Sequence, residues 1–403
     1  MDLLKAILDF FKREIPECVA LKDENEFLEL IISSINSLKT SKNQNASELY
    51  KKLNETQFLC YYMVMDIIIQ GQLYKLIDLD RKFISDFIEE FLEFNDIKYR
   101  KDFKMSFGLK GDLIYDFIIF SDYLNDPNND EYSNPQIKRP VGIKIHNIFE
   151  DYQNREYEFE PYQQYLMSEE YNIRLIHVFE PFLYDFNKLD VLKNIILHAC
   201  NKIQNKVYAR QTEVIVKPAA QMKEFFLRNN IQGYRNAKTA FVLIDKKSKE
   251  ELMCYTVGHA YFGKGLYDAE IARGGCKLGT VVVGGASKLW NFIIDYYKDK
   301  DLNGNKVSVD SIVYYVDLNH YSGTSMGFLE GNEYVKTTPG FWNFWIENKE
   351  LKNREPKRHS LIMQKIREGK IIEVKMAGTM VNVWKRNSNN KRLEEFISSH
   401  KRK

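Results

Sequence analysis

Short apolar segments rich in β-branched and aromatic residues recur from residue 112 onward, and segments with helical periodicity separate them. The first three are DLIYDFIIF (Asp112–Phe120), VGIKI (Val141–Ile145) and IRLIHVFE (Ile173–Glu180), with the helix-like YEFEPYQQYLMSEE before the third. TAFVLID, ELMCYTVGHAYF and SIVYYVDL continue the pattern. Strands that alternate with helices are typical of a sheet covered by helices. We therefore predict an α/β (α+β) fold class.

The remaining segments predict helices. FLELIISSINSL, YMVMDIIIQGQLYKLIDL and RKFISDFIEEFLEFN in the first hundred residues have apolar positions three and four apart. Leu189 to Asn230 is also predicted to be helical, with a turn at Pro218. A chain of 403 residues is long enough for two or three domains. We divide it into a helical N-terminal region (1–95), a first sheet domain (96–205), a second sheet domain (206–350, from a boundary placed between 205 and 235) and a basic C-terminal segment (351–403).

Cysteine usage and hydropathy indicate the compartment. The five cysteines are scattered and form no CxxC pair, so neither a zinc site nor a disulfide framework is predicted. The N-terminus MDLLKAILDFFKREIPEC carries acids and has no continuous apolar core, and no stretch approaches the roughly 20 apolar residues of a membrane span. We expect a cytoplasmic protein with no membrane partner.

The net charge of +2 conceals an uneven distribution. Residues 351–403 contain 15 Lys and Arg against 5 Asp and Glu, a balance of +10, which leaves −8 for the rest. A basic segment of this kind predicts contact with nucleic-acid phosphates. The alternative is a solvated helix and a frayed end.

Acidic, basic and imidazole side chains fall on neighbouring strands of the first predicted sheet. Asp116 lies in DLIYDFIIF, and Lys144 and His146 follow in VGIKIH. Magnesium-dependent nucleases use carboxylates on adjacent strands to hold the metal that activates water. Here the second strand offers Gly142, Ile143 and Lys144, so the expected second acid is missing. The alternative for Asp116 is a structural ion pair.

Two further candidates follow at the end of the third strand. His177 and Glu180 in LIHVFE are expected at the sheet edge where α/β proteins collect their chemistry. His177 could assist proton transfer, and Glu180 could join Asp116 as a metal ligand. A satisfied structural histidine is the alternative.

A glycine turn is the second candidate site. VVVGGASKLWNFII joins a strand to an amphipathic helix through Val283, Gly284 and Gly285, with Ser287 and Lys288 in the first helical turn. Main-chain N–H groups at such a turn favour an anion. An ordinary strand-to-helix turn is the alternative.

Aromatic and basic residues crowd the end of the second sheet domain. Phe341, Trp342, Phe344 and Trp345 could stack on unpaired bases, or they could be core residues on alternate positions. The predicted nucleic-acid contacts are the cations that follow: Lys352, Arg354, Lys357, Arg358, Lys385 and Arg386.

Several of these segments together resemble phage homing endonucleases. The resemblance rests on YNIRLIHVFE, NKIQNKVYARQTEVIVKP, EFFLRNNIQGY, KLGTVVVGGASKLWNFI, YSGTSMGF and TTPGFW, which occur in the same order over roughly residues 85 to 360. It implies a very-short-patch-repair-like or PD-(D/E)XK-like nuclease core in residues 96–205. It also implies an acetyltransferase (GNAT)-like domain in residues 206–350, and a phage-encoded protein acting in an infected bacterial cell.

The resemblance also implies roles for individual residues. Asp116 takes the first metal-ligand position, but Lys144 stands where the family has an acid and His146 where it has Asn or Asp. These departures put Mg²⁺-dependent cleavage in doubt. The acids that could restore the site are Glu89, Glu90, Glu150 and Asp151.

In the second domain, the resemblance implies that the turn at Gly284 grips the pyrophosphate of an acyl-coenzyme A. YDAEIARGG, with Asp268, Glu270 and Arg273, is similar to a segment of related phage adenine-modification proteins; a buried ion pair is the alternative.

Three hypotheses follow. The first is a DNA-binding endonuclease with Mg²⁺ at Asp116 and Lys144 on the phosphate. The second is a DNA-recognition factor of nuclease ancestry without cleavage. The third is an acyl-coenzyme A-dependent transferase that acts on DNA or protein.

Overall fold

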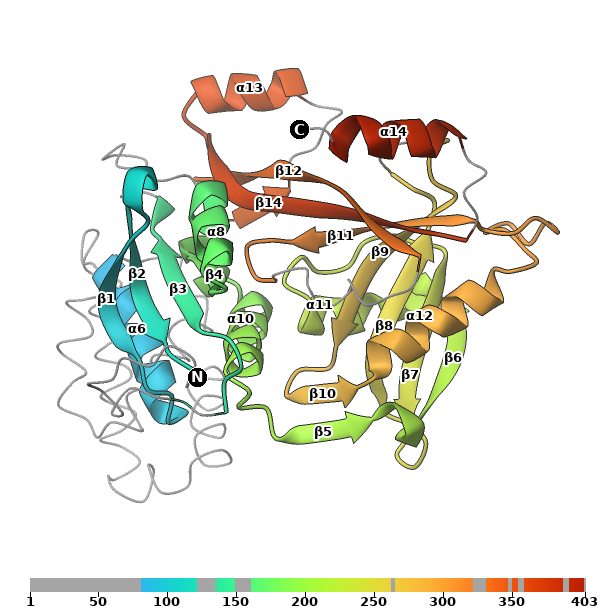
Figure 1. Cartoon of the computed structure of the whole chain (residues 1–403), viewed down its shortest axis with the longest axis horizontal. Helices are drawn as coiled ribbons and strands as arrows, with labels where there is room; N and C mark the ends of the chain where they lie inside the picture. Colours follow the sequence, from blue (N-terminus) through green and yellow to red (C-terminus); the bar gives the residue numbers. More distant parts are fainter. Residues whose placement is uncertain are drawn as a thin grey trace, which may run out of the picture.

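The computed structural model describes residues 81–121, 134, 136–148, 161–261, 265–321, 331–346, 350–353, 359–386 and 391–401. Within them the fold is mixed α/β, as predicted, with a four-stranded sheet and an eight-stranded sheet side by side (Figure 1). No helix in these ranges is both long and apolar enough to cross a bilayer. The predicted helices before residue 81 lie outside the described residues.

The four-stranded sheet has the order β1-β2-β3-β4. Strands β1 (Arg100–Ser106), β2 (Asp112–Ile119) and β3 (Val141–His146) form an antiparallel meander, and β4 (Arg174–Phe179) runs parallel to β3. The three strands predicted from the sequence here are therefore confirmed.

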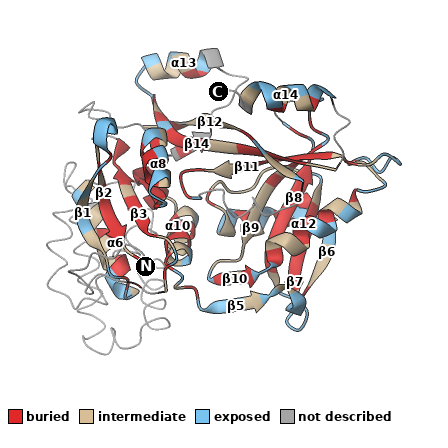
Figure 2. Ribbon diagram, viewed as in Figure 1, coloured by how far each residue is buried: buried red, intermediate tan, exposed pale blue. Residues whose placement is uncertain are grey.

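Helices cover both faces of this sheet. On one face, α6 (Arg81–Phe94) and α10 (Phe186–Ala199) contribute apolar side chains, among them Phe87 and Ile195, to a buried cluster that includes Ile143 of β3. On the other face, α8 (Pro161–Glu170) adds Met167 to a cluster that includes Leu175. The short α9 (Glu180–Leu183) continues β4. Figure 2 shows the resulting buried centre of the sheet.

The larger sheet has the order β13-β12-β14-β11-β9-β8-β7-β6. Its strands are β6 (Thr212–Pro218), β7 (Thr239–Asp245), β8 (Glu251–Gly258), β9 (Ala269–Cys276), β11 (Ser311–Asp317), β12 (Asn332–Trp345), β13 (Glu350–Asn353) and β14 (Ile371–Lys385). Neighbours are antiparallel except β9 and β11, which are parallel. Strands β9 and β11 pair with each other only as far as Ile271 and Tyr314. Beyond these residues β9 pairs only with β8, and β11 pairs only with β14.

Helices also flank the larger sheet. Helix α12 (Gly285–Tyr296) packs Trp290 and Ile293 on one face, and α11 (Lys223–Asn229), with a preceding 3-10 turn (Ala219–Met222), packs Phe226 on another cluster. Helix α14 (Lys391–Lys401) lies against β12, and its Leu393 and Ile397 belong to the same buried cluster as Val383 of β14. Helix α13 (His359–Arg367) contacts β14. A separate parallel pair joins β5 (Asn205–Tyr208) to β10 (Thr280–Val283).

Two sequence expectations differ from this architecture. Residues 205–218 were expected to be helical, but they form β5 and β6, because alternating β-branched residues such as Val214 and Val216 suit a sheet edge. Strand β14 lies inside the larger sheet, between β11 and β12, so a boundary at residue 350 would cut through that sheet.

The two sheets share buried side chains. Phe344, Ile372 and Val374 of β12 and β14 belong to the same apolar cluster as Ile176 of β4. Tyr165 of α8 contacts Leu318 and Ala377 in a smaller cluster. The two predicted sheet domains are therefore packed against each other through a common core.

Candidate functional site

Asp116 and Lys144 lie together, as the sequence predicted. The carboxylate of Asp116 is almost fully buried, and its Oδ2 accepts the main-chain N–H of Ile145 at 2.8 Å. Lys144 Nζ is 3.6 Å from the same oxygen and donates to the carbonyl of Ile114. A third partner was not predicted: Arg81 Nη2 donates to Asp116 Oδ1 at 2.6 Å. Asp116 is thus held by two cations and one main-chain donor.

An aromatic ring fills the space beside Gly142 on β3. A Cβ atom on Gly142 would lie 2.5 Å from Cδ1 of Tyr115. Tyr115 is fully buried, and its hydroxyl is 2.9 Å from Ser168 Oγ on α8. In the described residues, no group of three or more His, Cys, Asp or Glu side chains is placed to hold a metal ion. Glu150 and Asp151 lie outside those residues.

Glu180 is fully buried and engaged. Its Oε2 accepts the N–H of Ile148 at 3.1 Å, and its Oε1 accepts the hydroxyl of Tyr184. These bonds fasten the start of α9 to the segment after β3. Glu89, another candidate acid, accepts bonds from Tyr99 and Lys101.

His146 and His177 form a buried pair. His146 Nε2 and His177 Nδ1 are 2.8 Å apart, and the His146 ring stacks on Phe179 with centroids 4.6 Å apart. Burial, and then the nearby His320, lower the pKa of His177 to about 3. Burial and then His177 hold the pKa of His146 well below its ordinary value. Both imidazoles are therefore neutral at physiological pH.

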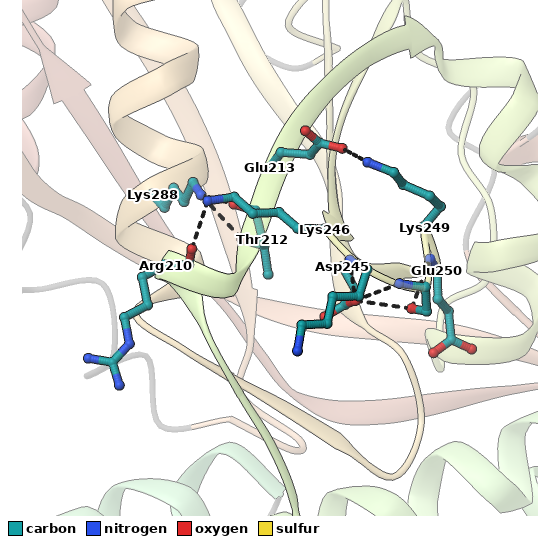
Figure 3. A network of polar contacts seen from close by, with 10 residues as sticks. Arg210, Thr212, Glu213, Asp245, Lys246, Lys249, Glu250 and Lys288 are labelled. Atoms are coloured by element: carbon teal, nitrogen blue, oxygen red, sulfur yellow. Dashed lines mark hydrogen bonds and ion pairs between the residues drawn. The ribbon is translucent and has the colours of Figure 1, made fainter.

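At the predicted glycine turn, Gly284 caps α12 in the left-handed conformation, with φ +77°. Gly285 packs tightly, because a Cβ there would lie 2.7 Å from Val282 Cγ1. Lys288 donates to the carbonyl of Ala209. It also donates to the carbonyl of Thr212 (Figure 3). Burial, and then the neighbouring Lys246, lower the pKa of Lys288. The ammonium group thus ties α12 to the start of β6.

A polar cluster that sequence reasoning found only in part lies along β9 and at the carboxyl end of β11. Glu270 pairs with Arg235 rather than Arg273, and it also accepts the N–H of Tyr261 at 2.7 Å. Arg273 Nε donates to the carbonyl of Gly233 at 3.0 Å, and burial lowers the pKa of Arg273 to about 10.

Asp317 and His320 complete this cluster. Asp317 Oδ2 lies 3.0 Å from His320 Nδ1, and its Oδ1 accepts the N–H of Asn319 at 3.0 Å. Burial opposes ionisation of Asp317, but His320 and the Asn319 donors outweigh it and lower its pKa. The signal for this pair was an Asp at the carboxyl end of the buried strand SIVYYVD.

Of the cations predicted to contact nucleic acid, two have described partners within the protein, and the side chains of the others lie outside the described residues. Lys385 pairs with Glu333 and Glu394, and Arg386 donates to the carbonyl of Ile294 at 2.6 Å. Lys352 lies in β13, and its side chain is outside the described residues, as are Arg354, Lys357 and Arg358. The exposed cations in this part of the chain that the structure describes include Arg367, Lys370, Lys375, Lys391 and Arg392.

The aromatic residues near the end of β12 take up core and junction positions. Phe344 is fully buried, and Trp342 makes an edge contact with Phe182 at 5.4 Å between ring centroids. Lys365 Nζ lies 4.3 Å from the centroid of Trp345. The core alternative therefore accounts for Trp342 and Phe344.

The sequence matches no family model, and no curated protein shows significant similarity to it.

Proposed function

We propose that this protein binds DNA without cutting it, and that its four-stranded sheet descends from a nuclease sheet in which an ion pair has replaced the metal site. The observation that carries the proposal is the bond from Arg81 to Asp116. A permanent cation at 2.6 Å competes directly with a divalent metal for the same carboxylate. Lys144 at 3.6 Å adds a second positive charge where the nuclease resemblance expects an acid.

The order of elements supports the nuclease ancestry. Helix α6 is followed by the meander β1-β2-β3, then α8, then the parallel strand β4. Asp116 on β2 and Lys144 on β3 thus lie at the strand positions that the resemblance to phage homing endonucleases implies. The same arrangement supports the descent of this sheet from a domain that contacted DNA.

DNA contact is assigned to the basic C-terminal part of the chain. Arg367, Lys370 and Lys375 are exposed at the end of α13 and the start of β14. Cations clustered on one surface attract the phosphate backbone, and each contact makes binding more salt-dependent.

A gel-shift and nicking experiment tests this proposal. The full-length protein is expected to shift a duplex in EDTA and to leave supercoiled plasmid intact in Mg²⁺ or Mn²⁺. Replacing Arg367, Lys370 and Lys375 by Ser should weaken binding and reduce the salt slope by up to about 3, roughly one for each lost phosphate contact. The matched control replaces the exposed lysines Lys206, Lys223 and Lys247 by Ser and should bind normally. Absence of DNA binding by the wild type, or metal-dependent nicking that Asp116→Ala abolishes, would overturn the proposal.

A second candidate, acyl-coenzyme A-dependent transfer, is favoured by the divergence of β9 and β11. Beyond Ile271 and Tyr314 these parallel strands lose their mutual hydrogen bonds, and the segment after α11 bonds to both strands through Asn230 and Gln232. Diverging parallel strands accord with the acetyltransferase resemblance. Calorimetric titration with acetyl-coenzyme A tests it: saturable heat supports transfer, and no heat rejects it.

A further inference from the structure

Strand β6 (Thr212–Pro218) forms one edge of the eight-stranded sheet (Figure 1). Among the described residues it pairs with β7 alone. An edge strand presents main-chain N–H and C=O groups that can pair with a strand of another chain. Within β6, the residue Val216 is 37% exposed. The outer edge of β6 is therefore a candidate surface for strand pairing.

The pairing of β6 with β7 fixes which main-chain groups of β6 point outward. Just before β6, the N–H of Lys246 donates to the carbonyl of Gln211 at 3.0 Å. Hydrogen-bonded and non-hydrogen-bonded pairs alternate along an antiparallel ladder, so every second residue after Gln211 bonds to β7. Val214 and Val216 lie between those residues in an unbroken register. Their N–H and C=O groups therefore point away from β7, toward the free edge.

The sequence TEVIVKP of β6 is self-complementary in one antiparallel register. When two copies pair about Ile215, Glu213 lies opposite Lys217 of the partner subunit. Val214 lies opposite Val216 of the partner subunit, and because the main-chain groups of both residues point outward, each such pair exchanges both hydrogen bonds. Opposite charges that face each other across two strands stabilise an antiparallel pair, and β-branched residues pack well in one. One register thus satisfies the main chain and the side chains together.

The ends of β6 fit the same register. Pro218 has no N–H group, and it would lie opposite Thr212 of the partner subunit. Both main-chain groups of Thr212 are already used within its own chain, since its N–H donates to Ala209 and its carbonyl accepts Lys288 (Figure 3). Pro218 therefore leaves no main-chain group of Thr212 unpaired, and the intermolecular ladder is confined to the two valines.

Charged partners on the same sheet extend the match. Glu213 Oε1 lies 2.7 Å from Lys249 Nζ (Figure 3), and Lys217 pairs with Glu251. Pairing of Glu213 with Lys217 of the partner subunit would join these two ion pairs into one series in which positive and negative groups alternate. This charge complementarity favours a second copy of the chain as the occupant of the edge.

Exposed apolar side chains lie beside this edge. Val216 is directly opposite Phe241 of β7, and the rings of Phe241 and Phe292 of α12 have centroids 6.1 Å apart. Val216 and Phe292 are each 37% exposed. Strand pairing would cover Val216 with Val214 of the partner subunit and remove apolar surface from water, which is favourable.

We propose that two copies of this chain associate through β6, in antiparallel register about Ile215, and continue the larger sheet across a two-fold axis. A two-fold interface joins the same patch on both subunits, so it requires a self-complementary surface. Glu213 and Lys217 provide it, because they are equally far from Ile215 in the sequence and carry opposite charges. The inference does not depend on DNA binding.

Sedimentation velocity of the full-length protein tests the association. The wild type should show a monomer–dimer equilibrium that depends on protein concentration. Val216→Pro should abolish the dimer, because it removes an outward N–H and leaves the bonds to β7 in place; edge strands accept proline where the N–H faces solvent. Thermal unfolding checks that this variant is folded. The control Lys104→Glu breaks an exposed ion pair on β1, the edge strand of the other sheet, and should dimerise as wild type.

Mixing two charge variants tests the register. Glu213→Lys alone places like charges opposite each other at both ends of the interface, and so does Lys217→Glu alone. Each variant should therefore dimerise about tenfold more weakly than the wild type. An equimolar mixture of the two should recover dimers, because each end of the interface then pairs a positive with a negative side chain. A purely structural role of these residues within one chain would give no recovery on mixing.

Hydrogen exchange identifies what occupies the edge. In the dimer, the amides of Val214 and Val216 should exchange more slowly as the protein concentration rises. Slow exchange that does not depend on concentration would show that another part of the same chain covers β6, and it would rule the proposal out. The same conclusion follows from a wild type that stays monomeric, from a dimer that Val216→Pro and both charge variants leave intact, or from charge variants that do not associate when mixed.

Discussion

Arg81 Nη2 donates to Asp116 Oδ1 across 2.6 Å and so joins the first turn of α6 to strand β2. The side chain of Arg81 is 38% exposed and that of Asp116 only 7%. The ion pair therefore lies at the boundary between solvent and the core of the four-stranded sheet, where Arg81 offsets the negative charge of the buried carboxylate.

Asp116 should contribute to the free energy of unfolding. Asp116→Ala removes the acceptor of the Ile145 N–H, and an unpaired buried donor costs about 1–3 kcal/mol. Asp116→Asn keeps a carbonyl oxygen for that donor and should cost less. Urea unfolding measures both, with Asp112→Ala, at a more exposed ion pair, as the control that changes little. An Ala variant as stable as the wild type would contradict this assignment.

Two substitutions should recreate a metal site. Arg81→Ala removes the competing cation, and Lys144→Glu places a second carboxylate beside Asp116. The double variant is expected to bind Mg²⁺ or Mn²⁺ and to nick supercoiled plasmid slowly, whereas each single variant stays inactive. Adding Asp116→Ala should remove any activity gained. If the folded double variant binds no metal, the nuclease ancestry loses its main support.

Gly142 should not accept a side chain. A Cβ would lie 2.5 Å from the Tyr115 ring, and overpacking of this kind costs about 1–3 kcal/mol. Gly275→Ala is the control, because a Cβ there meets its neighbours only at 3.6 Å or more. A smaller residue at 115 should relieve the clash, so Tyr115→Leu combined with Gly142→Ala should lose less than the sum of the two single changes. Thermal unfolding decides between these outcomes.

Acidification should destabilise the fold through the buried histidines. The pKa of His177 is about 3 in the folded state, against an ordinary value of 6.5, so the unfolded chain takes up the proton first as pH falls. The contribution of the neutral histidine to the free energy of unfolding is fully present above pH 6.5. Below pH 6.5 the free energy of unfolding falls by up to about 1.4 kcal/mol per pH unit for each such group. The groups that act on these rings are His320, Asp317, Lys144 and Arg81.

The measurement is urea unfolding at pH 7.5, 6 and 5. His177→Gln should flatten the pH dependence relative to the wild type, and His259→Gln should leave it unchanged. Identical slopes for wild type and His177→Gln would show that the imidazole is not buried in its neutral form.

Residue order along the chain was enough to predict the mixed α/β class, α6 and strands β2, β3 and β4, because periodicity and β-branched content act locally. It was also enough to predict that Asp116 lies beside Lys144, since they occupy adjacent strands of one sheet. Periodicity failed at residues 205–218, where a sheet edge supplied partners that no local pattern reveals.

Long-range packing decided the rest. Arg81 reaches Asp116 only because α6 lies on the sheet, and β14 enters the larger sheet between strands from which it is distant in sequence. His177 meets the segment that carries His320 only where two sheets share a core. Contacts of this kind depend on burial and on pairing between distant segments. The sequence alone therefore predicted which charged residues matter but not which residues they contact.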